Sequence, residues 1–306
     1  MGRYIEGLLA ALAAANPEGL RVRPLFLPGS LERGLRKSLR RLPFAYALAD
    51  ARRALVLWRE RPSVYHETNH VAPPFRGPVV VTVHDLSTLL YPQTQDRARA
   101  RHFASRLSRA RGAARVIVPT QAIAGEVVER LGVSPARVRV IHHGVDARFV
   151  PGPGPRGGFV LYAGDAGPRK GLATLRAALS EGMELKLAGP GHGYVSDEEL
   201  LALYRGAAVL VLPSLYEGFG LPLAEAMACG TPCVASDDPA LVEISGGAAL
   251  HFPRGDASAL RLLLRRVLGD ASLRAELSRK GLDRARAFRW EECAARHLEV
   301  YREAAG

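Results

Sequence analysis

The sequence contains few cysteines and no long apolar run. Only three of its 306 residues are cysteines, Cys229, Cys233 and Cys293, and no two of them form a C-x-x-C pair. This argues against a disulfide framework, and we expect buried thiols in a reducing cytosol. No stretch approaches the roughly 20 apolar residues that span a bilayer, and the mixed composition of the first 19 residues argues against a signal peptide. Any membrane contact is therefore expected to be peripheral.

Acidic residues are outnumbered by basic ones. There are 30 aspartates and glutamates against 42 lysines and arginines, which gives a formal net charge of +12. Such an excess favours an anionic partner, and nucleic acid, a nucleotide or an acidic membrane surface would each provide one. The remaining proportions, 48% hydrophobic and 24% charged residues, are those of an ordinary globular protein. A chain of this length is sufficient for two domains, each with its own core.

Apolar runs and amphipathic segments alternate along the chain. Runs such as VVVTV and VIVP predict buried strands and the segments between them predict helices, so we expect an α/β protein with parallel sheets covered on both faces. Alternating proline and glycine predict a linker over 151–157. It separates an N-terminal domain, 1–150, from a C-terminal domain, 158–289. In the first domain the patterns predict a helix over 4–15, a strand over 20–27 and a basic helix over 98–114.

The stretch VLVLPSLYEGFGLPLAEAMACGTPCVASD, residues 209–237, predicts a buried strand, a ligand loop and a helix that begins near Pro222. Gly218 and Gly220 allow the backbone to approach a ligand closely, and the helix start offers free N–H groups to a phosphate. Glu217 and Glu225 are separated by seven residues. Two carboxylates placed in this way are suited to accept hydrogen bonds from the hydroxyls of a sugar or a ribose.

Two other places carry candidate functional residues. His84 and Asp85 follow the apolar run 79–83, and ligands of open α/β sheets bind at the carboxyl ends of strands. A neutral imidazole, with an ordinary pKa near 6.5, is suited to orient a hydroxyl or to accept a proton there. Arg169 and Lys170 precede a predicted helix, where cations oppose the helix dipole, and this placement indicates a bound anion.

Residues 31–42 have five basic side chains on one predicted helical face. A solvated arginine-rich surface is one interpretation. The other is docking on anionic lipid headgroups, to which each basic residue contributes roughly 1 kcal/mol. Docking predicts salt-sensitive binding to anionic liposomes that is lost when Arg36, Lys37 and Arg40 are neutralised.

The segment PSLYEGFGLPLAEAMACGTPCVASD, with Glu217 and Glu225 in it, resembles the signature of the retaining glycosyltransferases of family 4, which have the GT-B fold. The resemblance implies two Rossmann-like domains facing each other across a cleft, with a C-terminal helix, about 290–306, that packs back onto the first domain. It also implies the site. Arg169 and Lys170 would bind the diphosphate of a nucleoside-diphosphate sugar, His84 and Glu217 the transferred sugar, and Glu225 the ribose. The further donor-binding positions that it implies are Gly164, Tyr194, Gly218, Phe219, Gly220 and Leu221, with Gly2 and Asp85 in an acceptor or phosphate loop.

The same resemblance implies a hexosyltransferase that retains anomeric configuration, in which the leaving phosphate helps to deprotonate the acceptor. It implies no metal and no cofactor, and the chain has no D-x-D cluster for a metal. We expect a glycan or lipid-linked acceptor, GDP-mannose as the first donor to consider, and no nucleic acid. The protein is expected in the cytoplasm, with peripheral contact at the inner face of the membrane as an open alternative. A catalytically inactive nucleotide-sugar-binding protein and a GT-B epimerase or phosphorylase are the alternative functions.

The sequence departs from the family pattern at two places. The residues Gly2-Arg3-Tyr4 resemble the tail of the glycine-rich loop that follows the first strand, so the first strand of the N-terminal domain is expected to be missing. In the second domain, the segment that begins at Gly193 follows the turn AGPG almost at once, so a helix and a strand are expected to be missing there. This shortening leaves open whether Tyr194 covers a base or only packs.

Overall fold

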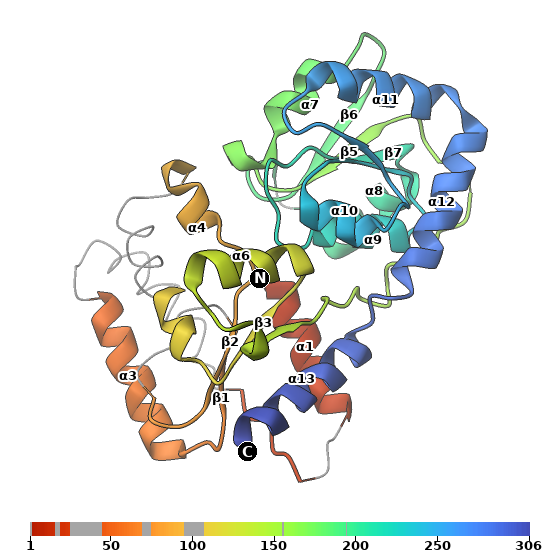
Figure 1. The fold of residues 1–306 in the computed structure, drawn as a ribbon. Helices are drawn as coiled ribbons and strands as arrows, with labels where there is room; N and C mark the ends of the chain where they lie inside the picture. The colour runs from red at the N-terminus through yellow and green to blue at the C-terminus, as the bar shows by residue number, and fades with distance from the viewer. Residues whose placement is uncertain are drawn as a thin grey trace.

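The computed structural model describes residues 2–15, 19–24, 45–68, 75–94, 107–154, 156–193 and 195–306. Two α/β lobes are connected by two crossing segments (Figure 1). We call residues 2–145 together with 290–305 the N-lobe, and residues 159–285 the C-lobe. Each lobe contains one parallel sheet, as the sequence predicted.

The sheet of the N-lobe has four parallel strands in chain order, β1-β2-β3-β4. They are short, and apart from the half-buried Val79 the valines and isoleucine of the two central strands are buried because helices cover both faces. The strands are β1 (Tyr65–Glu67), β2 (Val79–Thr82), β3 (Arg115–Val118) and β4 (Val138–Val140). The helices are α1 (Gly2–Ala15), α3 (Ala45–Glu60), α4 (Ser87–Leu90), η1 (Pro92–Thr94), η2 (Ser108–Gly112), α6 (Gln121–Leu131) and η3 (Pro135–Arg137).

Three local predictions for the N-lobe need correction. Residues 20–24 form no strand, and the rest of the predicted strand lies outside the described residues. The end of the predicted basic helix is the 3-10 helix η2, and its earlier part is likewise not described. Helix α1 begins at Gly2 rather than at Tyr4. Tyr4 and Leu8, one turn apart, are both buried within one apolar cluster.

The sheet of the C-lobe has five parallel strands in the order β6-β5-β7-β8-β9. The strands are β5 (Val160–Ala163), β6 (Leu185–Ala188), β7 (Val209–Leu212), β8 (Cys233–Ser236) and β9 (Leu250–Phe252). The chain moves outward from β5 to β6 and then returns to the other side of β5 for β7. The strand order therefore reverses between β5 and β7, and ligands of open α/β sheets bind at such a switch point.

Both faces of this second sheet are apolar. Leu161 and Leu210 belong to one buried cluster, and their neighbours Val160 and Val209 belong to the cluster on the other face, as the alternation of side chains in a strand requires. The helices are η4 (Pro168–Lys170), α7 (Leu172–Ala178), α8 (Asp197–Gly206), α9 (Leu221–Ala228), α10 (Pro239–Ser245), α11 (Ala257–Gly269) and α12 (Ala271–Ala285). Between β6 and α8, the described residues form no helix and no strand. The three cysteines are buried free thiols.

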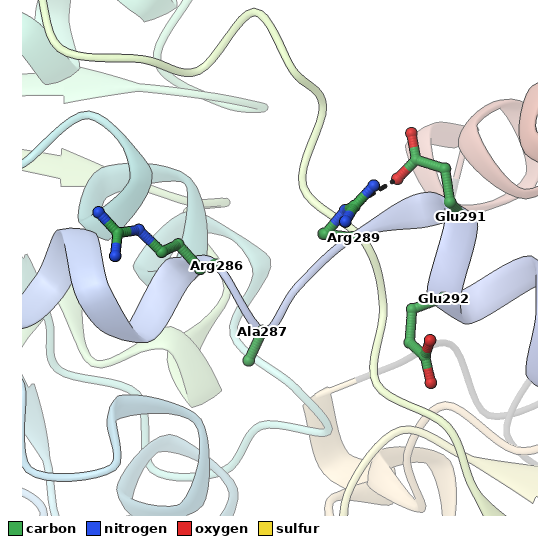
Figure 2. Close-up of a pocket in the computed structure, with 5 residues that line it drawn as sticks. All are labelled: Arg286, Ala287, Arg289, Glu291 and Glu292. Atoms are coloured by element: carbon green, nitrogen blue, oxygen red, sulfur yellow. Dashed lines mark ion pairs between the residues drawn. The ribbon is translucent and has the colours of Figure 1, made fainter.

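Two segments cross between the lobes, and they pair with each other. The backbone N–H of Val145 donates to the carbonyl of Phe288 over 2.9 Å, and Val145 and Arg289 form an isolated parallel bridge. A hollow of about 440 Å3 at this joint is lined by Arg286, Ala287, Arg289, Glu291 and Glu292. Figure 2 shows the Arg289 side chain directed toward Glu291. No predicted site residue lines this hollow.

The second crossing leads into α13 (Trp290–Ala305), which packs against α1 and β2 of the N-lobe. Figure 1 shows α13, in dark blue, beside α1, in red. A chain of buried hydrogen bonds connects these elements. Tyr301 Oη lies 2.8 Å from His66 Nδ1, and His66 Nε2 lies 2.8 Å from Thr82 Oγ1. Tyr4 Oη is 3.3 Å from Thr82 Oγ1 and 2.9 Å from His297 Nε2.

The proton positions in this chain follow from its last member. The carbonyl of Cys293 only accepts, so His297 Nδ1 carries a hydrogen, and in the neutral ring Nε2 accepts from Tyr4. The Tyr4 hydrogen is then used, so Thr82 donates to Tyr4, and His66 donates to Thr82 through Nε2. With both rings neutral, each contact of the chain therefore has one donor and one acceptor.

Candidate active site

The loops after β5 and β7 meet at the switch point of the C-lobe sheet. Gly164 follows β5, and its N–H donates to the carbonyl of Ala188 at the end of β6 over 2.9 Å. Gly171 follows the 3-10 helix η4 with a φ of +69°, and a Cβ there would lie 1.9 Å from the carbonyl oxygen of Pro213. Only glycine permits this approach, which places Arg169 and Lys170 beside the loop after β7.

Glu217 is bound by the loop after β5. Its Oε1 accepts a hydrogen bond from Lys170 Nζ at 2.7 Å and another from Ser214 Oγ at 2.7 Å. Arg169 Nη1 lies 4.0 Å from the second oxygen, Oε2, and 2.5 Å from the carbonyl oxygen of Tyr216. Glu217 is 9% exposed. Two cations and one carboxylate predicted from distant parts of the sequence therefore form one cluster.

The N-lobe closes over this cluster through the backbone of the same loop. A Cβ at Gly218 would lie 1.9 Å from the carbonyl oxygen of His84, so the Gly218 backbone packs directly against the turn after β2. The Thr120 hydroxyl donates to the Gly218 carbonyl over 3.0 Å. Tyr216 is buried in the N-lobe core, where its hydroxyl donates to Glu126 at 2.7 Å and accepts from the N–H of Leu86 at 2.8 Å.

His84 is held in one tautomer. Its Nε2 lies 2.8 Å from the carbonyl oxygen of Thr68, which only accepts, so Nε2 carries the hydrogen and Nδ1 is the acceptor. Burial lowers the pKa of His84 and outweighs the opposing effect of the Thr68 hydrogen bond, which keeps the ring neutral at pH 7. The ring packs against Tyr4 and His143, at centroid distances of 4.7 and 5.4 Å.

Asp85 has a mainly structural contact. Its Oδ1 accepts from the N–H of Ser87 over 2.8 Å, at the start of the short helix α4. Burial raises the pKa of this carboxyl, whereas the hydrogen bonds from Ser87 and the charges of Arg169 and Lys170 lower it. The lowering effects together are larger, so the pKa lies below its ordinary value. The two C-lobe cations therefore act across the interface between the lobes on an N-lobe carboxylate.

The start of α9 completes the loop. Phe219 is buried, and its ring centroid is 4.7 Å from that of His143 in the N-lobe. Gly220 adopts the left-handed conformation, with a φ of +84°, and Leu221 is the first residue of the helix. The helix therefore begins where the two lobes meet.

Glu225 belongs to a different set of contacts. It lies in the second turn of α9 and is 2% exposed. Oε1 accepts from Arg3 Nη1 over 2.7 Å, and Oε2 accepts from the Tyr204 hydroxyl over 2.8 Å. Burial raises the pKa of the Glu225 carboxyl, and Arg3 and Tyr204 only partly oppose this. The two glutamates of the motif are thus held by separate partners.

Two predicted site residues do not lie as expected or are not described. Gly2 forms part of helix α1 rather than of a phosphate loop, since the helix extends to the residues that pack against α13. Tyr194 lies outside the described residues. The sequence analysis missed Arg3 and Tyr204, which bind Glu225, and Tyr216, which anchors the loop. Arg3 adjoins the Gly2 that was singled out, but nothing in its spacing indicates a contact with residue 225.

No group of three or more histidines, cysteines, aspartates and glutamates is placed to hold a metal ion within the described part of the chain. Among the same residues, no helix has the length and hydropathy needed to span a membrane.

Solved structures with the same two-lobed arrangement are glycosyltransferases. Sucrose-phosphate synthase from Thermosynechococcus elongatus superposes with a TM-score of 0.71 at 23% identity, over 98% of this chain and 92% of that one. HepE from Anabaena, in complex with UDP-glucose, superposes with a TM-score of 0.71 at 17% identity, over 83% and 81% of the two chains. The fold is therefore GT-B, that of a class of two-lobed glycosyltransferases.

Sequence comparisons identify the family. Residues 2–149 match the family described as Glycosyltransferase Family 4, and residues 191–284 match Glycosyl transferases group 1. O-antigen chain mannosyltransferase B of Escherichia coli is 29% identical, over 86% of this chain and 81% of that protein. MMP alpha-(1->4)-mannosyltransferase of Mycolicibacterium hassiacum is 32% identical, over 74% of this chain and 66% of that protein. The chain belongs to glycosyltransferase family 4.

Proposed function

We propose that this protein is a retaining hexosyltransferase that moves a sugar, mannose in the first instance, from a nucleoside-diphosphate sugar to a glycan or lipid-linked acceptor in polysaccharide or glycolipid biosynthesis. The observation that supports this most directly is the cluster of Arg169, Lys170 and Glu217 at the switch point of the C-lobe sheet, facing the His84 turn of the N-lobe. It combines cations for a diphosphate with a carboxylate for sugar hydroxyls.

The proposed chemistry follows from the charges that develop as the anomeric bond breaks. Negative charge accumulates on the leaving diphosphate, and Arg169 and Lys170 are placed to stabilise it. Binding of the diphosphate would transfer Lys170 from Glu217 to phosphate oxygens, which leaves the carboxylate free to accept hydroxyl hydrogens of the transferred sugar. The cations supply the stabilisation for which other enzymes use a metal ion, so we propose transfer without a metal.

In this scheme His84 orients the sugar or the acceptor. A neutral imidazole whose Nδ1 accepts is suited to a hydroxyl group, and burial favours the neutral form. The leaving phosphate would take the acceptor proton, so a separate nucleophile is not needed. Mannose is supported by the two relatives described as mannosyltransferases.

The proposal predicts selective stabilisation by one nucleotide sugar. In a thermal-shift panel of GDP-, UDP-, ADP- and dTDP-sugars, we expect GDP-mannose at about 100 times its Kd to raise the Tm by about 5 °C or more. Glu276→Gln, on the exposed face of α12, is the control and should shift in the same way. Stabilisation by another nucleotide sugar would correct the donor, and the absence of any shift would contradict the proposed function.

Product analysis separates transfer from the alternatives, because only transfer releases a free nucleoside diphosphate in proportion to the added acceptor. An epimerase would change the sugar without releasing it, and an inactive binding protein would do neither. The same assay in the presence of EDTA tests whether a metal is needed.

Peripheral contact with an anionic membrane stays a prediction. Residues 31–42, on which it depends, lie outside the described residues. The neighbouring helix α3 has two large apolar side chains on its outer surface, Leu55 and Trp58, spaced one turn apart beside the exposed Arg59. Tryptophan and leucine flanked by arginine are typical of helices that lie in a membrane interface, which agrees with a lipid-linked acceptor.

A further inference from the structure

Glu225, which the resemblance to family 4 assigns to the ribose of the donor, has both carboxylate oxygens bound by side chains of the protein itself. Tyr204, on α8 of the C-lobe, donates to Oε2, and Arg3, on α1 of the N-lobe, donates to Oε1. Ribose hydroxyls would have to approach the same two oxygens. Each oxygen has a further lone pair, so what limits the approach of the hydroxyls is how the two partners cover the carboxylate.

The burial of the two partners differs sharply. Tyr204 is completely buried, and α8 and α9, which carry the two members of the pair, pack directly against each other. The side chain of Arg3 is 39% exposed, while that of Glu225 is 2% exposed. A ligand that arrives from solvent can therefore reach the Glu225 carboxylate only on the side that Arg3 covers.

Arg3 also has a second partner that would hold it after release. Its Nη2 lies 2.9 Å from Asp197 Oδ1, at the exposed start of α8. The other oxygen of Asp197 binds Arg148 of the crossing segment at 2.8 Å. The Arg3 guanidinium group therefore forms two ion pairs, one with a buried carboxylate and one with an exposed carboxylate. When it leaves the buried carboxylate it keeps the other ion pair.

We propose that Arg3 is a gate on the nucleotide site, covering the Glu225 carboxylate in the empty protein and displaced from it by the ribose diol of a nucleoside diphosphate while it stays paired with Asp197. This inference rests on the assignment of Glu225 to ribose. Nucleotide binding is then coupled to the first turn of α1 and, through it, to the contact between the lobes. Part of the binding free energy is used to open the gate, which weakens the apparent affinity of the empty protein.

Removal of the gate should therefore tighten nucleotide binding. In calorimetry at pH 8, we expect Arg3→Gln to lower the Kd for GDP by about tenfold. Inorganic pyrophosphate has no ribose, and its Kd should not fall. Equal or weaker binding of GDP to Arg3→Gln would overturn the inference. Equal binding is the result expected if Arg3 only stabilises the fold, and weaker binding is the result expected if Arg3 contacts the nucleotide.

Two further variants complete the experiment. Arg148→Gln removes the other partner of Asp197 without touching Glu225 and should leave both dissociation constants unchanged. Arg3→Lys keeps the charge but cannot bridge two carboxylates, and it should give a Kd for GDP between those of the unchanged protein and Arg3→Gln. If Arg3→Gln folds poorly, Arg3→Lys takes its place as the test variant.

Glu225→Gln in the otherwise unchanged protein separates the two levels of the argument. If it weakens GDP binding while Arg3→Gln does not tighten it, the ribose assignment stands and the gate is wrong. If Glu225→Gln leaves the Kd for GDP unchanged, the ribose assignment itself is wrong, and the gate falls with it.

Discussion

Replacement of Glu217 by glutamine is expected to lower the rate of sugar transfer by about 10²- to 10³-fold with little change in stability. The amide oxygen of glutamine can still accept from Lys170 and Ser214, so the loop keeps its hydrogen bonds. The amide nitrogen, however, cannot accept a hydroxyl hydrogen at the position of the second oxygen. The interaction that is lost is therefore one with the reacting sugar, and kcat should fall more than KM rises.

The measurement is the release of nucleoside diphosphate with donor and acceptor both saturating, together with the Tm of each variant. Glu276→Gln makes the same chemical change on the surface of α12 and should have normal activity. Near-normal turnover by Glu217→Gln would remove Glu217 from the mechanism.

Acidification is expected to destabilise the N-lobe. His143 and His297 are buried, and His66 and His84 are half-buried. Loss of hydration lowers the pKa of each ring, that of His297 to about 4, and all four are held in neutral form. In the unfolded chain these rings take up protons near pH 6.5, so the stability present above that pH is lost as the pH falls from about 6.5 toward the folded-state pKa values. His297 alone should account for about 2 kcal/mol at pH 5.

Urea unfolding at pH 7.5 and pH 5 measures this loss, and fluorescence reports on the correct lobe because the two tryptophans, Trp58 and Trp290, both lie in the N-lobe. The control is His297→Gln, which keeps an acceptor for Tyr4 but does not titrate. The free energy that it loses between the two pH values should be smaller by about 2 kcal/mol. If the two proteins lose the same amount, His297 does not carry the effect.

Local sequence patterns were sufficient for the architecture. The apolar runs that became β2, β5 and β7 are each bounded on at least one side by glycine or proline, and a run of that kind forms a buried strand wherever helices cover both faces. The position of a ligand loop follows from such strands, since the loops at their carboxyl ends lie together at one edge of the sheet. The grouping of Arg169, Lys170 and Glu217 in one site came from the resemblance to family 4, before any distance was known.

Local patterns failed where strand and helix boundaries depend on distant contacts. Residues 20–24 alternate in a strand-like way but have no neighbouring strand to pair with in the described part of the chain. Helix α1 extends back to Gly2, two residues beyond the predicted start, and it packs against α13, nearly 300 residues later in the sequence. Neither result is encoded within a short window of residues.

The sequence by itself determined the two parallel sheets and the loops on which the candidate site residues lie, because backbone hydrogen bonding and burial impose short, repeated patterns on it. Only the tertiary structure decided that Arg3 covers Glu225, that Tyr216 anchors the loop in the opposite lobe, and that His66 and His297 share one chain of hydrogen bonds. Each of these contacts joins residues that are far apart in the sequence and close only in the folded protein. Such a contact produces no periodic pattern in the sequence around either residue.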